Sequence, residues 1–511
     1  MPDHPNPHAP DPADAAIYTA READWRNGAL IYQVLVDRFA PSADLAAKAH
    51  LYPAPKVLRG WQELPRQGHY LEDAKLWTQE IEFWGGDLAS TLSRLGHLRD
   101  LGMDVLYLNP IHHAYTNHKY DALDYAAISP EFGSLDDFKA LADAAHALGL
   151  KLVLDGVFNH MGRNAPIFQA ALVDAHSPYR DWFNIGQQYP GGARSWWLAQ
   201  NLPELNLENP AVRDHVYNAP DSIVRSYLRN GADGWRLDVA VDIGYRYLAE
   251  LTAAAHAEKP GSLVVGEIAS YPAEWFPQVD AVMHFTLREI ILRTCDGRID
   301  AATAGRMIER LVAEAGIANM LKSWIYLDNH DTPRLATRLP DRRQRRLAQV
   351  LQFTLPGAPN LYYGSELGMT GGDDPAMRAP MRWDWATDDN PDLQWTRQLV
   401  ALRKTQRALR VGNLRPITSH QLLAFERHTD RVADTVLVFI NPSKQPVTET
   451  VMTGNSRLMN PFRLLDLMGT AAAPQRVFCG LVEVALPPHG FLVLQPEVQP
   501  AGGYSSYKRV P

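Results

Sequence analysis

The sequence ADGWRLDV, residues 232–239, decides the fold of this 511-residue chain. It is a short apolar run that ends in charged residues, with Arg236 and Asp238 two positions apart. Residues two apart on a β-strand point to the same side, so a guanidinium lies beside a carboxylate. Strands of parallel sheets are normally apolar throughout, so these charges mark the end of this strand as a candidate functional site.

Seven further apolar runs lie before and after this one, and segments with helical periodicity separate them. Alternating strands and helices predict βα units around a parallel sheet, and eight strands close a barrel. We therefore predict an α/β fold, a (β/α)8 TIM barrel over residues 28–410. The eight runs are residues 29–39, 103–110, 151–159, 232–239, 262–268, 279–285, 322–329 and 359–364.

The clearest helix predictions are residues 87–102, 134–149 and 341–353, where apolar residues recur at intervals of three and four. Ser134 supplies an N-cap followed by acidic residues, and Gly149 supplies a C-terminal stop. These features predict helices that follow the first, second and seventh strands.

The segments outside the regular alternation predict the domain organisation. Residues 40–85 and 160–210 are too long for plain βα loops, and long loops at one end of a barrel usually carry function. We predict that 160–210 forms a small inserted domain after the third strand. Short alternating strands predict a C-terminal antiparallel β-sandwich over 412–496. Residues 1–27 are expected to be a disordered leader and 497–511 a flexible tail.

Composition excludes several classes of function. The net charge is −8, and no Lys/Arg surplus exists for binding nucleic acid. No apolar stretch is long enough to cross a membrane, and no secretion signal precedes the first strand, so a cytoplasmic protein is expected. Cys295 and Cys479 form no disulfide or metal-binding pattern, and we expect two ordinary buried thiols.

Four of the eight predicted strands end in acids or imidazoles. A neighbouring cation favours an ionised carboxylate, so we expect Arg236 to keep Asp238 charged, with Glu267 as its protonated partner. Such a pair is typical of a retaining glycosidase. Taken singly, an Asp at a strand end is more often a helix N-cap, and a His is more often an ordinary loop residue. The residues at these ends are Asp155, Asn159, His160, Arg236, Asp238, Glu267, Asp328, Asn329, His330 and Asp331.

Seven sequence blocks, each on the expected strand or loop, resemble the α-amylase superfamily of retaining glycoside hydrolases. The resemblance extends from about residue 28 to 495 and implies an α-glucan oligosaccharide substrate. The blocks are LYLNPI (106–111), DGVFNH (155–160), LPELN (202–206), GWRLDV (234–239), GEI (266–268), LDNHD (327–331) and GSELGM (364–369).

The resemblance also implies roles for individual residues. Asp238 matches the nucleophile, Glu267 the general acid and base, and Asp331 the carboxylate that stabilises the transition state. Asn159 matches a position that binds structural calcium in some members, so calcium is possible although no cofactor is required. The residues that match the sugar subsite beside the cleaved bond are His118, Tyr120, His160, Arg236 and His330.

Within the superfamily, residues 279–292 and 362–384 are most similar to the cyclomaltodextrinase, neopullulanase and maltogenic amylase group. That group usually carries an N-terminal β-domain, whereas residues 1–27 are all that precede the predicted barrel. The resemblance leaves open whether the chain is a monomer or a homodimer. It also leaves open the preferred chain length, and the choice between α-1,4 and α-1,6 linkages.

Three alternatives to α-1,4-glucan hydrolysis remain. An α-glucosyltransferase would use the same carboxylates, with a sugar hydroxyl in place of water. A catalytically inactive carbohydrate-binding relative would normally have lost one of the three acids, and all three are present. A metal-dependent hydrolase is suggested by His112, His113, His118, His160 and His330, which lack the spacing of known metal motifs.

The chain is rich in aromatic rings, with 13 Trp and 20 Tyr. Several of the tryptophans fall at the predicted functional end of the barrel. Aromatic faces bind the apolar face of a sugar ring, although a large ring in a loop more often packs. We predict that Trp196 and Trp197 bind substrate. The other rings at this end are Trp61, Trp77, Trp84, Trp182, Trp275, Trp383 and Trp385.

Overall fold

Eight parallel strands form a closed barrel in the computed structural model, which describes residues 12–197, 199–460, 463–471, 473–499 and 505–510. The neighbours around the barrel follow the order β1-β14-β13-β12-β11-β10-β9-β6. Seven strands lie within predicted runs and β14 begins one residue before its run, so the predicted barrel is confirmed. The strands are β1 (Ile31–Val34), β6 (Val105–Leu108), β9 (Lys151–Gly156), β10 (Gly234–Leu237), β11 (Leu263–Ile268), β12 (Ala281–His284), β13 (Trp324–Tyr326) and β14 (Ala358–Tyr362).

Side chains alternate between the inside and the outside of the barrel. On β6, Val105 and Tyr107 belong to the interior cluster, whereas Leu106 and Leu108 belong to the larger core between strands and helices. The ring of Tyr107 packs 5.0 Å from that of Trp324 inside the barrel. The interior is therefore filled with side chains, and the chemistry is confined to the strand ends.

Helices surround the barrel, and Ser134 caps the first turn of α5 (Leu135–Ala147) as predicted. Ser134 accepts a hydrogen bond from the backbone N–H of Asp137, whose carboxylate binds back to Ser134. Asp341 caps the helix that precedes β14 by accepting a hydrogen bond from the backbone N–H of Arg343. The helices after the barrel strands are α2 (Val36–Phe39), α3 (Leu88–Leu92), α4 (Leu95–Leu101), α5 (Leu135–Ala147), α8 (Ile223–Arg229), α9 (Ala240–Glu258), α10 (Phe285–Cys295), α11 (Ala301–Ala315), α12 (Ile317–Lys322), α13 (Leu335–Arg338), α14 (Arg342–Thr354), α15 (Pro391–Thr405) and α16 (Arg407–Val411).

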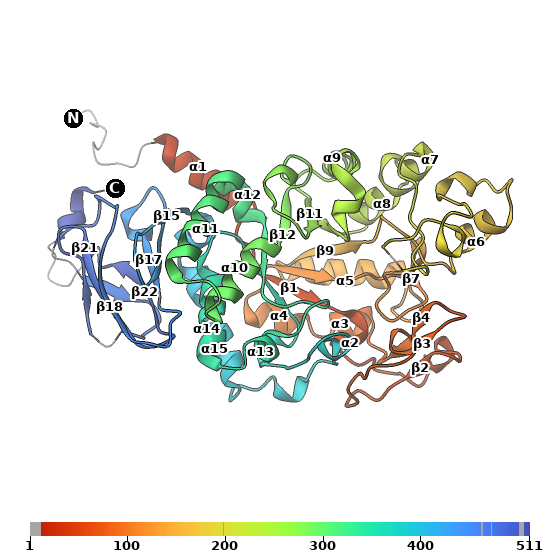
Figure 1. Cartoon of the computed structure of the whole chain (residues 1–511), viewed down its shortest axis with the longest axis horizontal. Helices are drawn as coiled ribbons and strands as arrows, with labels where there is room; N and C mark the ends of the chain where they lie inside the picture. Colours follow the sequence, from red (N-terminus) through yellow and green to blue (C-terminus); the bar gives the residue numbers. More distant parts are fainter. Residues whose placement is uncertain (1–11, 198, 461–462, 472, 500–504, 511) are drawn as a thin grey trace.

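The two long connections lie at the end of the barrel that is far from the C-terminal strands (Figure 1). The first packs a small core of its own around Phe83 and Leu76. The second is irregular, and backbone bridges tie His160 to Glu204 and Phe183 to Leu205. Their elements are β2 (Val57–Leu58), β3 (Tyr70–Leu71), β4 (Leu76–Trp77), β5 (Glu82–Phe83), α6 (Pro166–Val173) and α7 (Pro210–Arg213), and the pair β7 (His112–Ala114) and β8 (Ala122–Ile128) follows β6.

The C-terminal part consists of antiparallel sheets, as predicted. A six-stranded sheet has the order β15-β16-β17-β22-β19-β20, and β18 pairs with β21. Side chains of both sheets, such as Phe439 and Val484, share one core. These strands form the blue region at the opposite end from α6 in Figure 1. Their bounds are β15 (Asn413–Pro416), β16 (Leu423–His428), β17 (Val436–Ile440), β18 (Val447–Met452), β19 (Arg463–Asp466), β20 (Gln475–Arg476), β21 (Leu481–Leu486) and β22 (Phe491–Pro496).

The predicted disordered leader, residues 1–27, is wrong for part of its length. Residues Pro12–Ala23 form helix α1, while residues 1–11 lie outside the described residues. Arg21 donates hydrogen bonds to the carbonyl of Val411 (2.9 Å) and to the side chain of Asn413 (2.8 Å). These tertiary contacts hold a segment whose Pro- and Asp-rich composition had indicated disorder.

The flexible tail predicted for 497–511 also differs from the structure. Residues Ser506–Arg509 form a short 3-10 helix, and Tyr507 is buried in the C-terminal core. Residues 500–504 and 511 lie outside the described residues. Of the two thiols, Cys295 is buried as expected, whereas Cys479 is exposed. Within the described part of the chain, no helix combines the length and apolarity needed to pass through a membrane.

Candidate active site

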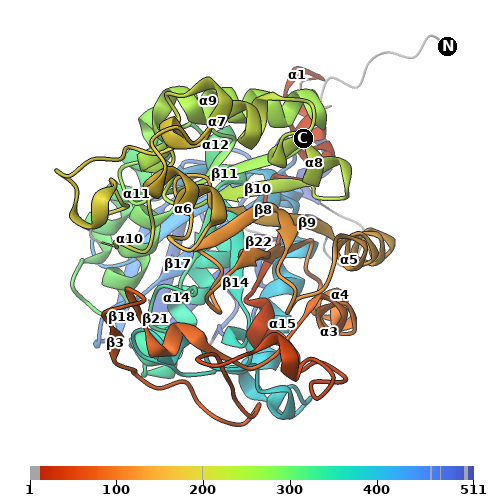
Figure 2. The same ribbon diagram turned by 90° about the vertical axis from the view of Figure 1, so that its right-hand side faces the viewer.

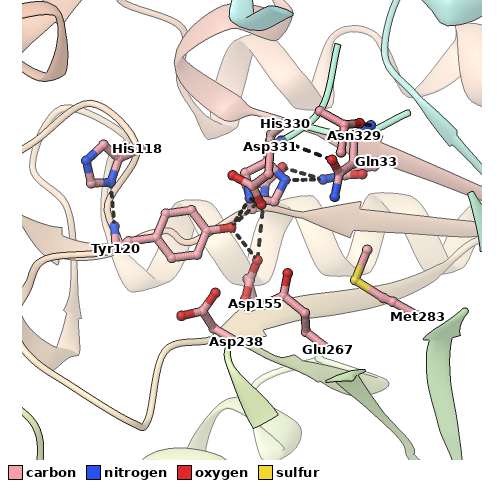
Figure 3. Close-up of polar contacts among 12 residues, drawn as sticks. Gln33, His118, Tyr120, Asp155, Asp238, Glu267, Met283, Asn329, His330 and Asp331 are labelled. Atoms are coloured by element: carbon pink, nitrogen blue, oxygen red, sulfur yellow. Dashed lines mark hydrogen bonds and ion pairs between the residues drawn. The ribbon is translucent and has the colours of Figure 1, made fainter. Parts of the chain in front are cut away.

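A fully buried guanidinium lies at the centre of the site. Arg236 NH1 lies 2.8 Å from Asp155 Oδ1 and 3.0 Å from Asp238 Oδ1. NH2 of the same residue forms an ion pair of 2.8 Å with Glu267 Oε1. The register of the barrel explains this meeting, because β10 pairs with β9 on one side and β11 on the other. The predicted neighbours Arg236 and Asp238 therefore do face each other, and Figure 3 shows Asp155, Asp238 and Glu267 side by side.

The backbone turn after β10 fixes Glu267 from the other side. Val239 has a φ of +40°, in the left-handed region that a β-branched residue rarely adopts. In this conformation its N–H donates a 3.0 Å hydrogen bond to Glu267 Oε2. The turn that carries Asp238 thus also positions Glu267.

A second set of contacts holds Asp331. Gln33 Nε2 donates to Nδ1 of His330 at 2.9 Å, so Nε2 of His330 carries its proton and lies 3.0 Å from Asp331 Oδ2. The ring of Tyr120 is stacked on that of His330, with centroids 5.4 Å apart and an interplanar angle of 6°. The Tyr120 hydroxyl donates to Asp155 Oδ2 at 2.9 Å, which links this set to the guanidinium (Figure 3).

Arg378 is a part of the site that the sequence analysis missed. Its Nε donates to the carbonyl of His330 at 2.8 Å, and its NH2 lies 3.2 Å from Asp331 Oδ1. NH1 forms a 3.0 Å ion pair with Asp374. Both residues lie in segment 362–384, whose sequence resembles the neopullulanase group. That resemblance is the feature of the sequence that could have identified them as site residues.

The electrostatics differ from the prediction for Asp238. Burial, followed by the charges of Glu267, Asp155 and Asp331, raises the pKa of Asp238 well above its ordinary value, and Arg236 offsets only part of this. The pKa of Asp238 is therefore shifted in the opposite direction from the one expected from Arg236 alone. One guanidinium shared among several carboxylates cannot neutralise all of them.

Asp331 behaves in the opposite way. Burial alone would raise its pKa, but the neighbouring His330 and Arg378 hold the pKa of this carboxyl well below its usual range. Burial lowers the pKa of His160 to about 3, so this imidazole is neutral. The site therefore offers an ionised carboxylate at Asp331 and a neutral imidazole at His160.

A cavity of about 700 Å³ opens above these groups, within the range of sites that bind small molecules. Asp238, Glu267 and Asp331 line it, and Arg236 and His330 are buried next to them. Predicted binding residues on its walls are His118, Tyr120, His160 and Trp196. Lining residues without a predicted role include Tyr70, Lys75, Glu80, Asn201, Val241, Phe285, Asp374 and Arg378.

The two predicted tryptophans have different positions. Trp196 lines the cavity, is stacked on His160 with ring centroids 5.7 Å apart, and donates its indole N–H to Asp242 at 3.0 Å. Trp197 is 82% exposed and is absent from the cavity wall. Among the other rings, Trp77 lines the cavity, whereas Trp84 is buried under the guanidinium of Arg38.

The described residues around Asn159 lack the cluster of acidic side chains that calcium sites commonly use. Calcium takes six to eight oxygen ligands, several of them carboxylates. The Asn159 amide nitrogen lies 3.4 Å from a ring nitrogen of His160. In the described ranges, no group of three or more His, Cys, Asp and Glu side chains could hold a metal ion.

The fold and the site define a class of enzyme, a barrel glycoside hydrolase with three carboxyl groups at the strand ends. Comparison with known proteins then gives the family. The description "Alpha amylase, catalytic domain" matches residues 33–412, and the chain belongs to the α-amylase family.

Named relatives come from the group that the sequence resembles. Neopullulanase 2 of Thermoactinomyces vulgaris is 34% identical over 421 residues, which cover 78% of this chain and 66% of that protein. A cyclomaltodextrinase of Geobacillus thermopakistaniensis is 33% identical over 489 residues, covering 92% of this chain and 77% of that protein. This chain thus spans just under two thirds of the neopullulanase.

One similar solved structure has nearly the same extent as this chain. It is the cyclic α-maltosyl-(1→6)-maltose hydrolase from Arthrobacter globiformis in complex with cyclic α-maltosyl-(1→6)-maltose. The TM-score is 0.77 at 30% sequence identity, and the match covers 92% of this chain and 99% of that one.

Proposed function

We propose that this chain hydrolyses α-1,4-glucosidic bonds of maltooligosaccharides or related α-glucans with retention of configuration. One observation carries the proposal. The carboxyl groups of Asp238 and Glu267 contact the same buried guanidinium at adjacent strand ends, beneath a cavity of about 700 Å³. Retaining glycosidases need two close carboxyl groups on either side of the scissile bond.

In the first step, the carboxylate of Asp238 attacks the anomeric carbon and forms a covalent glucosyl ester. Glu267 donates its proton to the departing glycosidic oxygen, so the leaving sugar departs as a neutral alcohol. In the second step Glu267 takes a proton from water, which attacks the anomeric carbon and releases Asp238. Atoms and charges balance over the cycle, because each carboxyl returns to its starting form.

Burial and the nearby charges of Glu267, Asp155 and Asp331 raise the pKa of Asp238 in the free protein. Catalysis requires an ionised Asp238 and a proton on Glu267. We propose that a bound sugar, which brings its glycosidic oxygen to Glu267 and its anomeric carbon to Asp238, selects this arrangement.

The remaining groups orient the sugar next to the cleaved bond. Asp331 stays ionised and can accept hydrogen bonds from two sugar hydroxyls, which tighten as the ring flattens. Neutral His160 supplies a further partner, and the ring of Tyr120 supplies an apolar surface. The Nε2–H of His330 points to Asp331 and holds that carboxylate in place. These contacts place the reacting atoms before the chemistry begins.

The test is the variant Asp238→Asn, with Asp388→Asn as a matched control on an exposed aspartate. We expect maltoheptaose cleavage to fall by at least ~1,000-fold in Asp238→Asn, because no nucleophile remains, with unchanged circular dichroism. NMR of the first product should show the α-anomer in the wild-type protein. Near-normal cleavage by Asp238→Asn, or a β-anomer as the first product, would contradict the proposal.

Linkage and the choice between hydrolysis and transfer form a second question. The similar hydrolase of Arthrobacter globiformis is named for a substrate with α-1,6 bonds, so such bonds are a second candidate. Time courses on maltotriose, maltoheptaose, β-cyclodextrin and pullulan separate the linkages. The same reactions with excess glucose as acceptor separate hydrolysis from α-glucosyl transfer.

A further inference from the structure

A small hairpin in the first long connection presents two aromatic rings that its own core does not use. β3 and β4 pair Tyr70 with Trp77 and Leu71 with Leu76. Leu76 is buried in the local core, whereas Tyr70 is 39% and Trp77 42% exposed. Alternation across the strands therefore sends the leucines into the core and both rings to the other face.

These two rings form a wall of the cavity that contains the catalytic carboxyls. Both line the cavity together with Asp238 and Glu267. Their centroids are 5.6 Å apart with an interplanar angle of 66°, so they support each other edge to face. Two large, half-exposed rings on the wall of a cavity that also contains three carboxyl groups are a natural surface for the apolar face of a sugar.

Hydrogen bonds fix the hairpin to the proposed sugar subsite. Glu80 follows the hairpin, and its Oε1 lies 3.0 Å from Nε2 of His118. The Glu80 carboxylate also accepts a hydrogen bond from the backbone N–H of Trp77. The backbone N–H of Asn117 donates to the carbonyl of Glu80 at 2.7 Å. His118 is in turn stacked on Tyr120. The rings are thus held at a fixed position relative to Tyr120.

The contacts also assign the hairpin to one side of the cleaved bond. Glu267 protonates the leaving oxygen, so the leaving sugar lies near the Val239 turn that binds Glu267 and near Trp196, which binds Asp242. The hairpin is linked instead to Tyr120. In Figures 1 and 2 the orange hairpin and the yellow segment around α6 stand on opposite sides of this end of the barrel.

We propose that Tyr70 and Trp77 form a donor-side subsite that binds a glucose unit beyond the one held by Tyr120. This subsite sets the preference for chain length. The inference rests on the proposed function, since it assumes an α-glucan in the cavity. It predicts that the rings act on binding of longer substrates and leave the chemical step unchanged.

The test compares Trp77→Ala with Trp196→Ala and with Trp385→Ala, an exposed ring outside the cavity. Trp77→Ala should raise KM for maltoheptaose about tenfold, the effect of one lost stacking contact, and leave kcat and the KM for p-nitrophenyl α-glucoside unchanged. On p-nitrophenyl α-maltopentaoside, Trp77→Ala should move cleavage toward the non-reducing end. Trp196→Ala should move it toward the reducing end, and Trp385→Ala should change neither.

Two kinds of result would overturn the inference. An unchanged KM for maltoheptaose, or a cleavage shift in the same direction as Trp196→Ala, removes Trp77 from the donor side. A changed oligomeric state by light scattering with unchanged KM would make the rings a contact between copies of the chain. If Trp77→Ala does not fold, Trp77→Phe, which keeps a ring, must show a smaller rise in KM of the same kind. Failure of the wild-type protein to cleave any maltooligosaccharide would refute the proposed function instead.

Discussion

Arg236 and Arg427 are both fully buried, yet different groups surround them. Arg236 contacts three carboxylates at the strand ends. Arg427 on β16 donates to three backbone carbonyls, those of Thr354 (2.7 Å), Gly412 (2.9 Å) and Asn413 (3.3 Å). The first arginine organises charge where a substrate enters, whereas the second joins the C-terminal sheet to the last residue of α14.

The ionisation of the two arginines follows from these partners. Burial would lower the pKa of Arg236, but Asp155 and Glu267 raise it well above its ordinary value. Burial lowers the pKa of Arg427, and Arg403 lies close enough to lower it further. Carbonyls at a helix C-terminus are only partial negative charges, so they compensate a buried cation less completely. Replacing each arginine should therefore affect a different property of the protein.

The largest effect is expected at Arg236. Arg236→Lys keeps the positive charge but loses the planar fork that contacts three carboxylates at once. We expect kcat for maltoheptaose to fall by ~1,000-fold or more, because Asp238 and Glu267 lose their fixed positions. Steady-state kinetics measures this change.

Arg236→Met separates charge from position. It leaves several buried carboxylates without a cation and should lower the free energy of unfolding by about 3–5 kcal/mol in urea titrations. If Arg236→Lys kept the wild-type kcat, the positive charge alone would be sufficient for catalysis. Arg236 and Arg427 would then not differ in the way proposed, with the first acting on kcat and the second on stability.

Much of this catalytic end could be predicted from the sequence. The two-residue spacing of Arg236 and Asp238 determines that they share a face, and the alternation of strands and helices brings β11 next to β10. Local periodicity therefore predicts strand ends well. It gave no information on Arg378 or Glu80, because they reach the site from irregular segments whose path depends on tertiary contacts.

A moderate effect is expected at the other arginine. Arg427→Met removes the donors to three buried carbonyls and should lower the free energy of unfolding by about 2–3 kcal/mol. The kcat of folded protein should remain unchanged, because no contact of Arg427 reaches the cavity. Arg431→Met, at an arginine of the same region that is largely exposed, is the control and should change stability little. A large fall in kcat for Arg427→Met would refute this assignment.

The contacts of Arg427 and the helix α1 mark the limit of sequence reasoning in this protein. Arg21 binds Val411 and Asn413, almost four hundred residues later in the chain. No local pattern in a Pro- and Asp-rich segment indicates such a partner. The pKa of Asp238 shows the same limit, because its direction depends on how many carboxylates surround one guanidinium in space.

The smallest effect concerns pH and distinguishes two carboxyls of one site. The pKa of Asp238 is raised by folding, so its ionisation costs stability above the raised pKa, and this cost vanishes below its value in the unfolded chain. The pKa of Asp331 is lowered by folding, so its charge stabilises the protein at pH values above the unfolded pKa, and this stabilisation is lost as pH falls through the folded pKa.

At pH 7, Asp238→Asn should therefore raise the urea midpoint and Asp331→Asn should lower it. Asp331 is 44% exposed, so solvent screening makes its effect the weaker one. The Asp238→Asn difference should shrink as the pH falls to about 4, the ordinary value for Asp, whereas the Asp331→Asn difference should still be present there and shrink only at lower pH. A shift of the same sign in both variants would show that the two carboxyls respond to burial alone, without the opposing influence of His330 and Arg378 on Asp331.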